Sequence, residues 1–127
     1  MFELSIKTHF SAAHRLVGYD GQCANPHGHN WDVEIFVRGS KLNDLGMLID
    51  YRDIKTAVRE AMKEIDHVDL NLVPAFIRAN PTSENLARYL HERLSERINT
   101  EHARVCRVTI CETPGTSASY WDDDECR

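Results

Sequence analysis

Apolar and polar residues alternate along residues 2–14, the first segment of the chain. A period of two predicts a strand with one buried face, and His14 has the parity of the apolar positions. We therefore expect its imidazole to project from the buried face at the end of the strand. Residues 16–26, which follow, are rich in Gly, Asp and Asn and predict a loop.

A second alternating segment begins near Trp31 and continues to Arg38. It predicts another half-buried strand. His27 and His29 have the parity of Trp31, so a strand that starts early would point both imidazoles the same way.

Two stretches with helical periodicity occupy the middle of the chain. The first has an apolar stripe over residues 54–65, and Asp50 is its expected N-cap. The second has a stripe over residues 86–98 and starts after Thr82 or Ser83, either of which can cap it. Both stripes predict amphipathic helices that cover an apolar surface.

Residues 105–111 and 118–121 predict two last strands around a turn at 114–115. The order is β-β-α-α-β-β, which we assign to one domain over residues 1–127. The expected fold class is α+β, with an antiparallel four-stranded sheet and two helices on one face. The sheet edges of a single subunit need covering, so we expect a homo-oligomer.

Charge and hydropathy exclude two classes of partner. The net charge of −5 and the pI near 5.8 argue against non-specific nucleic-acid binding, which requires basic residues to neutralise phosphates. The chain has no apolar run as long as a transmembrane helix and no signal-peptide pattern, so we expect no membrane partner and a cytoplasmic protein. A small anionic substrate remains compatible, because it needs only a local basic pocket.

Four cysteines invite a disulfide interpretation, but the cytoplasm keeps thiols reduced, and we expect none. Cys106 and Cys111 lie in an apolar run and are expected to pack as small core residues. Cys126 is expected to be a free surface thiol.

The histidines provide the strongest chemical signal. His27 and His29 flank one glycine, and two imidazoles at this spacing on a strand reach one ion. His14 at the end of the neighbouring strand completes a three-histidine set that suits zinc and leaves one coordination position open. The alternative is a closed structural site with Cys23 as the fourth ligand. Three other histidines stand alone and are expected to be structural or exposed: His9, His91 and His102.

Cys23, Asp66 and His67 are candidates for proton transfer. A thiol beside a dication loses its proton more easily than a free one, so Cys23 can act as a general base or nucleophile. His67 follows the first helix and allows two interpretations: a favourable interaction with the helix dipole, or an acid-base group oriented by Asp66.

Glu112, Thr82 and Ser83 are candidates for substrate binding. Glu112 ends an apolar strand, where a carboxylate needs a partner, either an arginine or a planar pair of N–H donors on a heterocycle. Thr82 and Ser83 either only cap the second helix or also help it to bind ligand acceptors at its N-terminus.

Several short motifs follow one another along the whole chain: Ala12–Leu16, Cys23–His29, Asp66-His67, Leu70-Asn71, Asn80–Asn85 and Glu112-Thr113. Together they resemble the family of 6-pyruvoyl-tetrahydropterin synthases and 6-carboxytetrahydropterin synthases. The resemblance implies a tunnelling fold (T-fold) that assembles into oligomeric barrels, a hexamer or similar.

The same resemblance implies roles for individual residues. Zinc would bind His14, His27 and His29, with Cys23 as proton acceptor. His67, supported by Asp66, would be the partner acid-base group, and Glu112 would anchor the pterin ring. The implied substrate is 7,8-dihydroneopterin triphosphate.

The spacing between Cys23 and His27 separates two branches of this family. Three residues lie between them. By resemblance this favours the carboxy-forming enzymes of queuosine biosynthesis, which release acetaldehyde and triphosphate, over the pyruvoyl-forming enzymes, which have five. Asn25-Pro26 is similar to the second branch, so the pyruvoyl-forming synthase stays as an alternative. A second alternative is a non-catalytic zinc- or pterin-binding module.

Overall fold

The computed structural model of the protein describes residues 1–122. Its strands and α-helices are β1 (Phe2–His14), β2 (His27–Gly39), α1 (Tyr51–Met62), β3 (Val68–Asp69), α2 (Ser83–Ile98), β4 (Arg104–Thr113) and β5 (Thr116–Tyr120). Three short 3-10 helices lie in the connections: η1 (Gln22–Ala24), η2 (Leu70–Leu72) and η3 (Pro74–Phe76).

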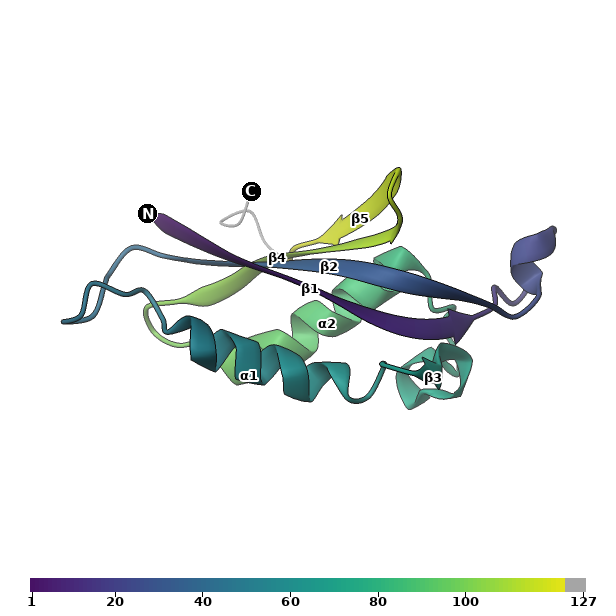
Figure 1. Ribbon diagram of the computed structural model, residues 1–127, viewed down its shortest axis with the longest axis horizontal. Coiled ribbons are helices and arrows are strands. Elements are labelled where there is room, and N and C mark those ends of the chain that lie inside the picture. The colour runs from purple at the N-terminus through teal and green to yellow at the C-terminus, as the bar shows by residue number, and fades with distance from the viewer. Residues whose placement is uncertain (123–127) are drawn as a thin grey trace.

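The sheet has the strand order β3-β1-β2-β4-β5, and both α-helices cover one of its faces (Figure 1). The four long strands pair antiparallel, as their alternation predicts. The expected α+β T-fold layout is therefore confirmed. The fifth strand is the difference: β3 has two residues and pairs parallel with β1 at Ala12 and Ala13. A segment this short has no periodicity that a sequence pattern can reveal.

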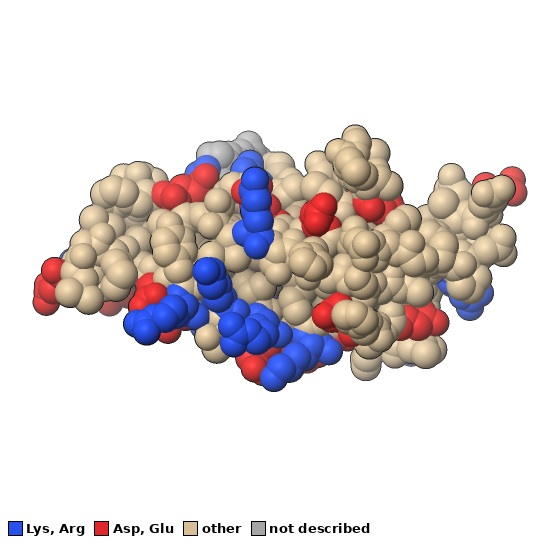
Figure 2. Space-filling model, in the orientation of Figure 1, with Lys and Arg blue, Asp and Glu red and all other residues tan. Residues whose placement is uncertain are grey.

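The core lies between the sheet and the helices. Phe10 and Trp31 are stacked across β1 and β2, and Ile54 of α1 and Leu90 of α2 are fully buried against the same layer. Burial of such side chains supplies the main driving force for this packing, about 1.5–3 kcal/mol each. The outward faces of the helices carry basic and acidic side chains together, and Figure 2 shows this mixed surface over the helical layer.

Both helix starts follow the sequence prediction. The Asp50 side chain accepts a hydrogen bond from the Arg52 backbone N–H (2.8 Å), and the Thr82 hydroxyl accepts one from the Asn85 backbone N–H (3.1 Å). The apolar stripe extends to residue 65, but the α1 helix ends at Met62 and the chain continues through turns to β3.

The cysteines are partly as expected. Cys106 is buried, but it takes part in a disulfide, so the expectation of fully reduced thiols is wrong. Its sequence surroundings carry no signal for this, because an apolar run suits a buried thiol and a buried half-cystine equally. Cys23 and Cys111 are free thiols, Cys23 exposed and Cys111 half-buried. Cys126 lies outside the described residues.

Candidate metal centre and surrounding site

Three imidazoles meet where β1 ends and β2 begins. The antiparallel register places His14 directly opposite His27, and Ala12 opposite His29. All three rings project from the face that the helices cover, which the parity of the two strands predicts. The ring centroids of His14 lie 4.5 Å from His27 and 5.2 Å from His29.

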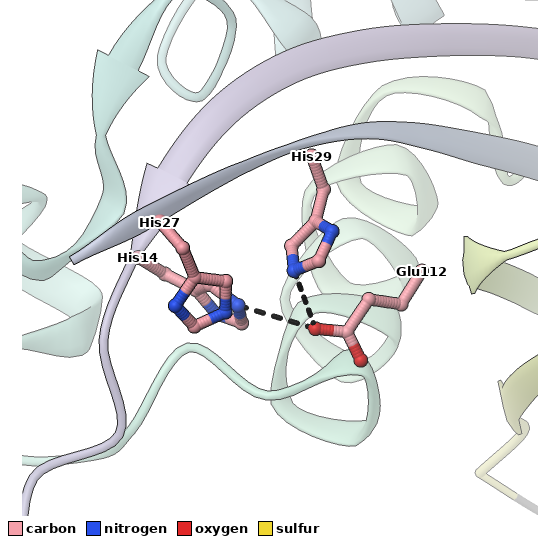
Figure 3. A group of neighbouring side chains, drawn as sticks. All are labelled: His14, His27, His29 and Glu112. Atoms are coloured by element: carbon pink, nitrogen blue, oxygen red, sulfur yellow. Dashed lines mark ion pairs between the residues drawn. The ribbon is translucent and has the colours of Figure 1, made fainter. Parts of the chain in front are cut away.

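Glu112 of β4 brings a carboxylate into the same place (Figure 3). Its Oε1 atom lies 3.2 Å from Nε2 of His14 and 3.0 Å from Nε2 of His29. One ligand atom from each of His14, His27, His29 and Glu112 lies within 4.8 Å of the others. This four-residue group, called the metal cluster below, contains Glu112 where the sequence allowed Cys23 as a possible fourth ligand.

Two of the rings have their tautomers defined by the backbone. Nδ1 of His14 lies 2.7 Å from the Pro81 carbonyl oxygen, and Nδ1 of His27 lies 2.8 Å from that of Asn25. A carbonyl only accepts, so each Nδ1 carries the proton and each Nε2 presents a lone pair to the cluster. Such orientation by an outer hydrogen bond is usual for metal-ligating histidines.

The Nε2 atoms of His14 and His29 converge on one carboxylate oxygen. Among the described residues, Nε2 of His14 and of His29 are buried and lack a hydrogen-bond partner, although the Glu112 carboxylate is beside them. The Nε2 lone pair of His14 and the Glu112 oxygen 3.2 Å away repel one another unless a cation lies between them. The donor set therefore fits a divalent metal, and its nitrogen-rich character suits zinc.

The local electrostatics favour neutral imidazole. Burial is the main cause that lowers the pKa of His29, while the Glu112 carboxylate opposes this effect and the charges of His14 and His27 add to it. Protons therefore compete less with a metal for this ring than for a free histidine.

The Trp31 ring packs against the metal cluster, a role that sequence reasoning missed. Its ring is fully buried and stands edge-on to His14 and His29, at centroid distances of 4.9 and 5.2 Å. The indole N–H donates a hydrogen bond to the Ala12 carbonyl (3.3 Å), which holds the Trp31 ring against β1. The parity shared by Trp31 and the two histidines was the available signal.

Asp66 and His67 form a contact pair at the edge of the sheet. Nδ1 of His67 lies 2.8 Å from Oδ1 of Asp66, and the same oxygen accepts from the Ser11 backbone N–H (3.0 Å). The His67 backbone has a positive φ of 58° and its N–H donates to the Ser11 carbonyl. Because α1 ends at Met62, orientation by Asp66 accounts for His67 better than the helix dipole does.

A surface cavity of about 550 Å³ extends from the metal cluster to His67. Its lining includes His29 of the metal cluster and His67. The imidazole of His67 is 80% exposed, so it is free to meet a ligand there.

The metal cluster does not include Cys23, Thr82 or Ser83. Cys23 is exposed on η1, which projects beyond the β1–β2 end of the sheet in Figure 1. Thr82 serves as the N-cap of α2, and Ser83 is the first residue of that helix. The preceding residue, Pro81, supplies the carbonyl that holds His14, so the start of α2 supports the metal cluster through the backbone.

The isolated histidines behave as expected. His9 and His102 are exposed. His91 is buried and its ring packs edge-on against Tyr120 at 5.1 Å.

Comparison with known families assigns the chain. A family profile described as 6-pyruvoyl tetrahydropterin synthase matches residues 3–123. The chain belongs to this family. A protein of Archaeoglobus fulgidus, named a putative 6-carboxy-5,6,7,8-tetrahydropterin synthase, is 37% identical over 103 residues, which cover 80% of this chain and 84% of that protein. The human 6-pyruvoyl tetrahydrobiopterin synthase is 34% identical over 132 residues, covering 93% and 90%.

The solved structure of Caenorhabditis elegans 6-pyruvoyl tetrahydropterin synthase has the same fold. It is superimposed with a TM-score of 0.86 at 28% identity and covers 96% of each chain. The chain is thus a T-fold protein of a pterin synthase family, whose members are enzymes that act on pterins. Among residues 1–122, no helix is long and apolar enough to cross a membrane.

Proposed function

We propose that the protein is a zinc-dependent lyase that converts 7,8-dihydroneopterin triphosphate into 6-carboxy-5,6,7,8-tetrahydropterin. The reaction consumes one water and releases acetaldehyde and triphosphate. It belongs to queuosine (7-deazaguanine) biosynthesis in the cytoplasm. The observation that carries the proposal is the convergence of His14, His27, His29 and Glu112 in a chain of this family.

In this proposal His14, His27 and His29 hold the metal through Nε2. Bound zinc supplies Lewis-acid polarisation of the substrate side-chain oxygens. The backbone carbonyls of Pro81 and Asn25 keep His14 and His27 as Nδ1–H tautomers, so both rings are ready to bind without rearrangement.

Cys23 and His67 divide the proton transfers. Cys23 accepts a proton from the substrate side chain, and its exposed position on η1 requires that loop to approach the bound substrate. His67 gives and takes the second proton at Nε2, because its Nδ1 is already engaged by Asp66.

Glu112 anchors the pterin ring beside the metal. A carboxylate pairs in a bidentate manner with the adjacent N–H donors of a guanidine-like heterocycle. Its position, 3.0 Å from His29, would place the ring next to the residues that would hold the metal. Thr82 and Ser83, at the start of α2, contribute hydroxyl and backbone N–H groups to the substrate.

The proposed choice of branch depends on the three residues between Cys23 and His27. The alternative is 6-pyruvoyl-tetrahydropterin formation, in which triphosphate is eliminated and the side chain stays whole. The similarity to the human enzyme supports that alternative.

A product assay separates the two. The zinc-loaded protein is incubated with 7,8-dihydroneopterin triphosphate, and the pterin and acetaldehyde are identified by mass spectrometry. Acetaldehyde in equal amount to triphosphate supports the carboxy-forming reaction. Triphosphate without acetaldehyde shows the pyruvoyl-forming one. No turnover together with bound zinc identifies a non-catalytic zinc or pterin-binding module.

We also propose that the protein is a homo-oligomer, a hexamer or similar. Outside its short contact with β3, the outer edge of β1 has no strand partner within residues 1–122, and neither does that of β5. Pairing of these edges between copies satisfies their backbone groups. Light scattering coupled to size exclusion measures the number of copies.

A further inference from the structure

A second cavity, of about 260 Å³, lies where the chain leaves β1 and is lined by two arginines. Arg15 enters from the end of β1, and Arg78 from the segment between η3 and α2. The amides of Asn71 and Asn80 line the same cavity, and no carboxylate of residues 1–122 does. In a chain of net charge −5, this is a local concentration of positive charge and hydrogen-bond donors.

The wall of this cavity is built by two side-chain clamps. The Asn71 amide accepts from the Arg15 backbone N–H (2.8 Å) and donates to the Arg15 carbonyl (3.1 Å). The Asn80 amide does the same with Val17, at 2.9 Å for each hydrogen bond. Each amide thus takes the place of a peptide partner for the segment that follows β1. The Asn71 clamp holds the backbone of Arg15 in place and so positions its side chain at the cavity.

Neither Arg15 nor Arg78 takes part in an ion pair within the described part of the chain. Arg38 and Arg52, in contrast, are paired with Glu3 and Asp50 at 2.6 and 2.9 Å. Two guanidinium groups left without carboxylates around one polar cavity indicate an anionic ligand. The planar fork of arginine matches phosphate oxygens in particular.

The cavity is joined to the metal cluster through both of its walls. Arg15 directly follows His14 in the chain. Asn80 directly precedes Pro81, whose carbonyl accepts from His14. A ligand in this cavity is therefore held by the same two segments that hold a metal ligand.

We propose that the cavity between Arg15 and Arg78 binds the phosphate chain of the substrate, and this inference rests on the function proposed above. The pterin ring would then lie toward Glu112, and the triphosphate would extend past His14 to the two arginines. Triphosphate released by the reaction leaves from this cavity.

Calorimetric titration of the zinc-loaded protein with inorganic triphosphate tests the proposal directly. We expect Arg15→Gln and Arg78→Gln each to weaken triphosphate binding about tenfold, as the loss of a charged hydrogen-bonding group predicts. Arg78→Lys retains part of the affinity. The control is Arg59→Gln on α1, outside the cavity lining, with unchanged binding. Direct contact of triphosphate with zinc is common to all variants and cancels in the comparison.

Steady-state kinetics provide a second readout. Both Gln variants are expected to raise KM for the triphosphate substrate with the zinc content intact. Titration with monophosphate distinguishes a chain-binding cavity from a general phosphate site: equal Arg dependence for both ligands contradicts the proposal. Unchanged triphosphate binding in both variants overturns it, even if the product assay succeeds. If the product assay fails but the Arg dependence is found, the cavity inference stands and the proposed reaction is wrong.

Discussion

Oε1 of Glu112 lies 3.0 Å from Nε2 of His29, a buried nitrogen that has no hydrogen-bond partner among the described residues. This relationship admits two roles for Glu112: a fourth metal ligand, or an anchor for the substrate ring next to the metal. The two roles predict different zinc contents for a Glu112 variant.

We expect Glu112→Gln to keep its zinc and to lose turnover about a hundredfold, because an amide cannot replace both acceptor oxygens of the carboxylate. Metal content by atomic emission and kcat/KM with the triphosphate substrate measure the two effects. His27→Ala is the matched control and should lose the metal. Loss of zinc from Glu112→Gln as well would identify Glu112 as a ligand.

Cys23→Ala is expected to retain zinc and to lose nearly all turnover, since the proposed mechanism makes its thiol the acceptor of a substrate proton and the thiol lies outside the metal cluster. The half-buried free thiol Cys111 is the control, and Cys111→Ala should remain active. A zinc-free Cys23→Ala protein would instead support the closed structural site.

Thr82 has a capping role in the structure that is separable from substrate binding. Thr82→Ala removes the side-chain acceptor for the Asn85 N–H and is expected to lower the free energy of unfolding by about 1 kcal/mol. Thr82→Ser keeps the cap and should restore stability in urea titrations. If kcat/KM falls equally in both variants, the threonine methyl group also contacts the substrate.

Tyr89 predicts a change of stability at alkaline pH. Burial raises the pKa of Tyr89, and the hydrogen bond that its hydroxyl donates to Glu64 raises it further. The folded state thus holds this proton more tightly than the unfolded state. Its contribution is complete below the ordinary tyrosine pKa of about 10 and is lost as pH rises through the folded value. Tyr89→Phe should show a smaller decline in the urea midpoint between pH 9 and 11; an identical decline contradicts the prediction.

The sequence determined the strands and the direction of the three histidines because a period of two encodes which face a side chain takes. It could not reveal how Glu112 reaches them, since this depends on β4 pairing with β2, a contact between segments about eighty residues apart in the sequence. Nor could it reveal the Asn71 and Asn80 clamps, which join side chains to a backbone more than fifty residues away. Such contacts depend on the tertiary fold and leave no local pattern.

The contact of His14 with Pro81 spans 67 residues of sequence, and the clamps on Arg15 and Val17 span 56 and 63. Closing loops of this length costs chain entropy that only the collapsed core can offset. The hairpin of β1 and β2 can form early and bring the histidines together, but the tautomer of His14 and the Asn80 clamp are set only when the segment before α2 docks. Metal capture and substrate binding should therefore mature last during folding, and late metal uptake is a kinetic marker of that docking step.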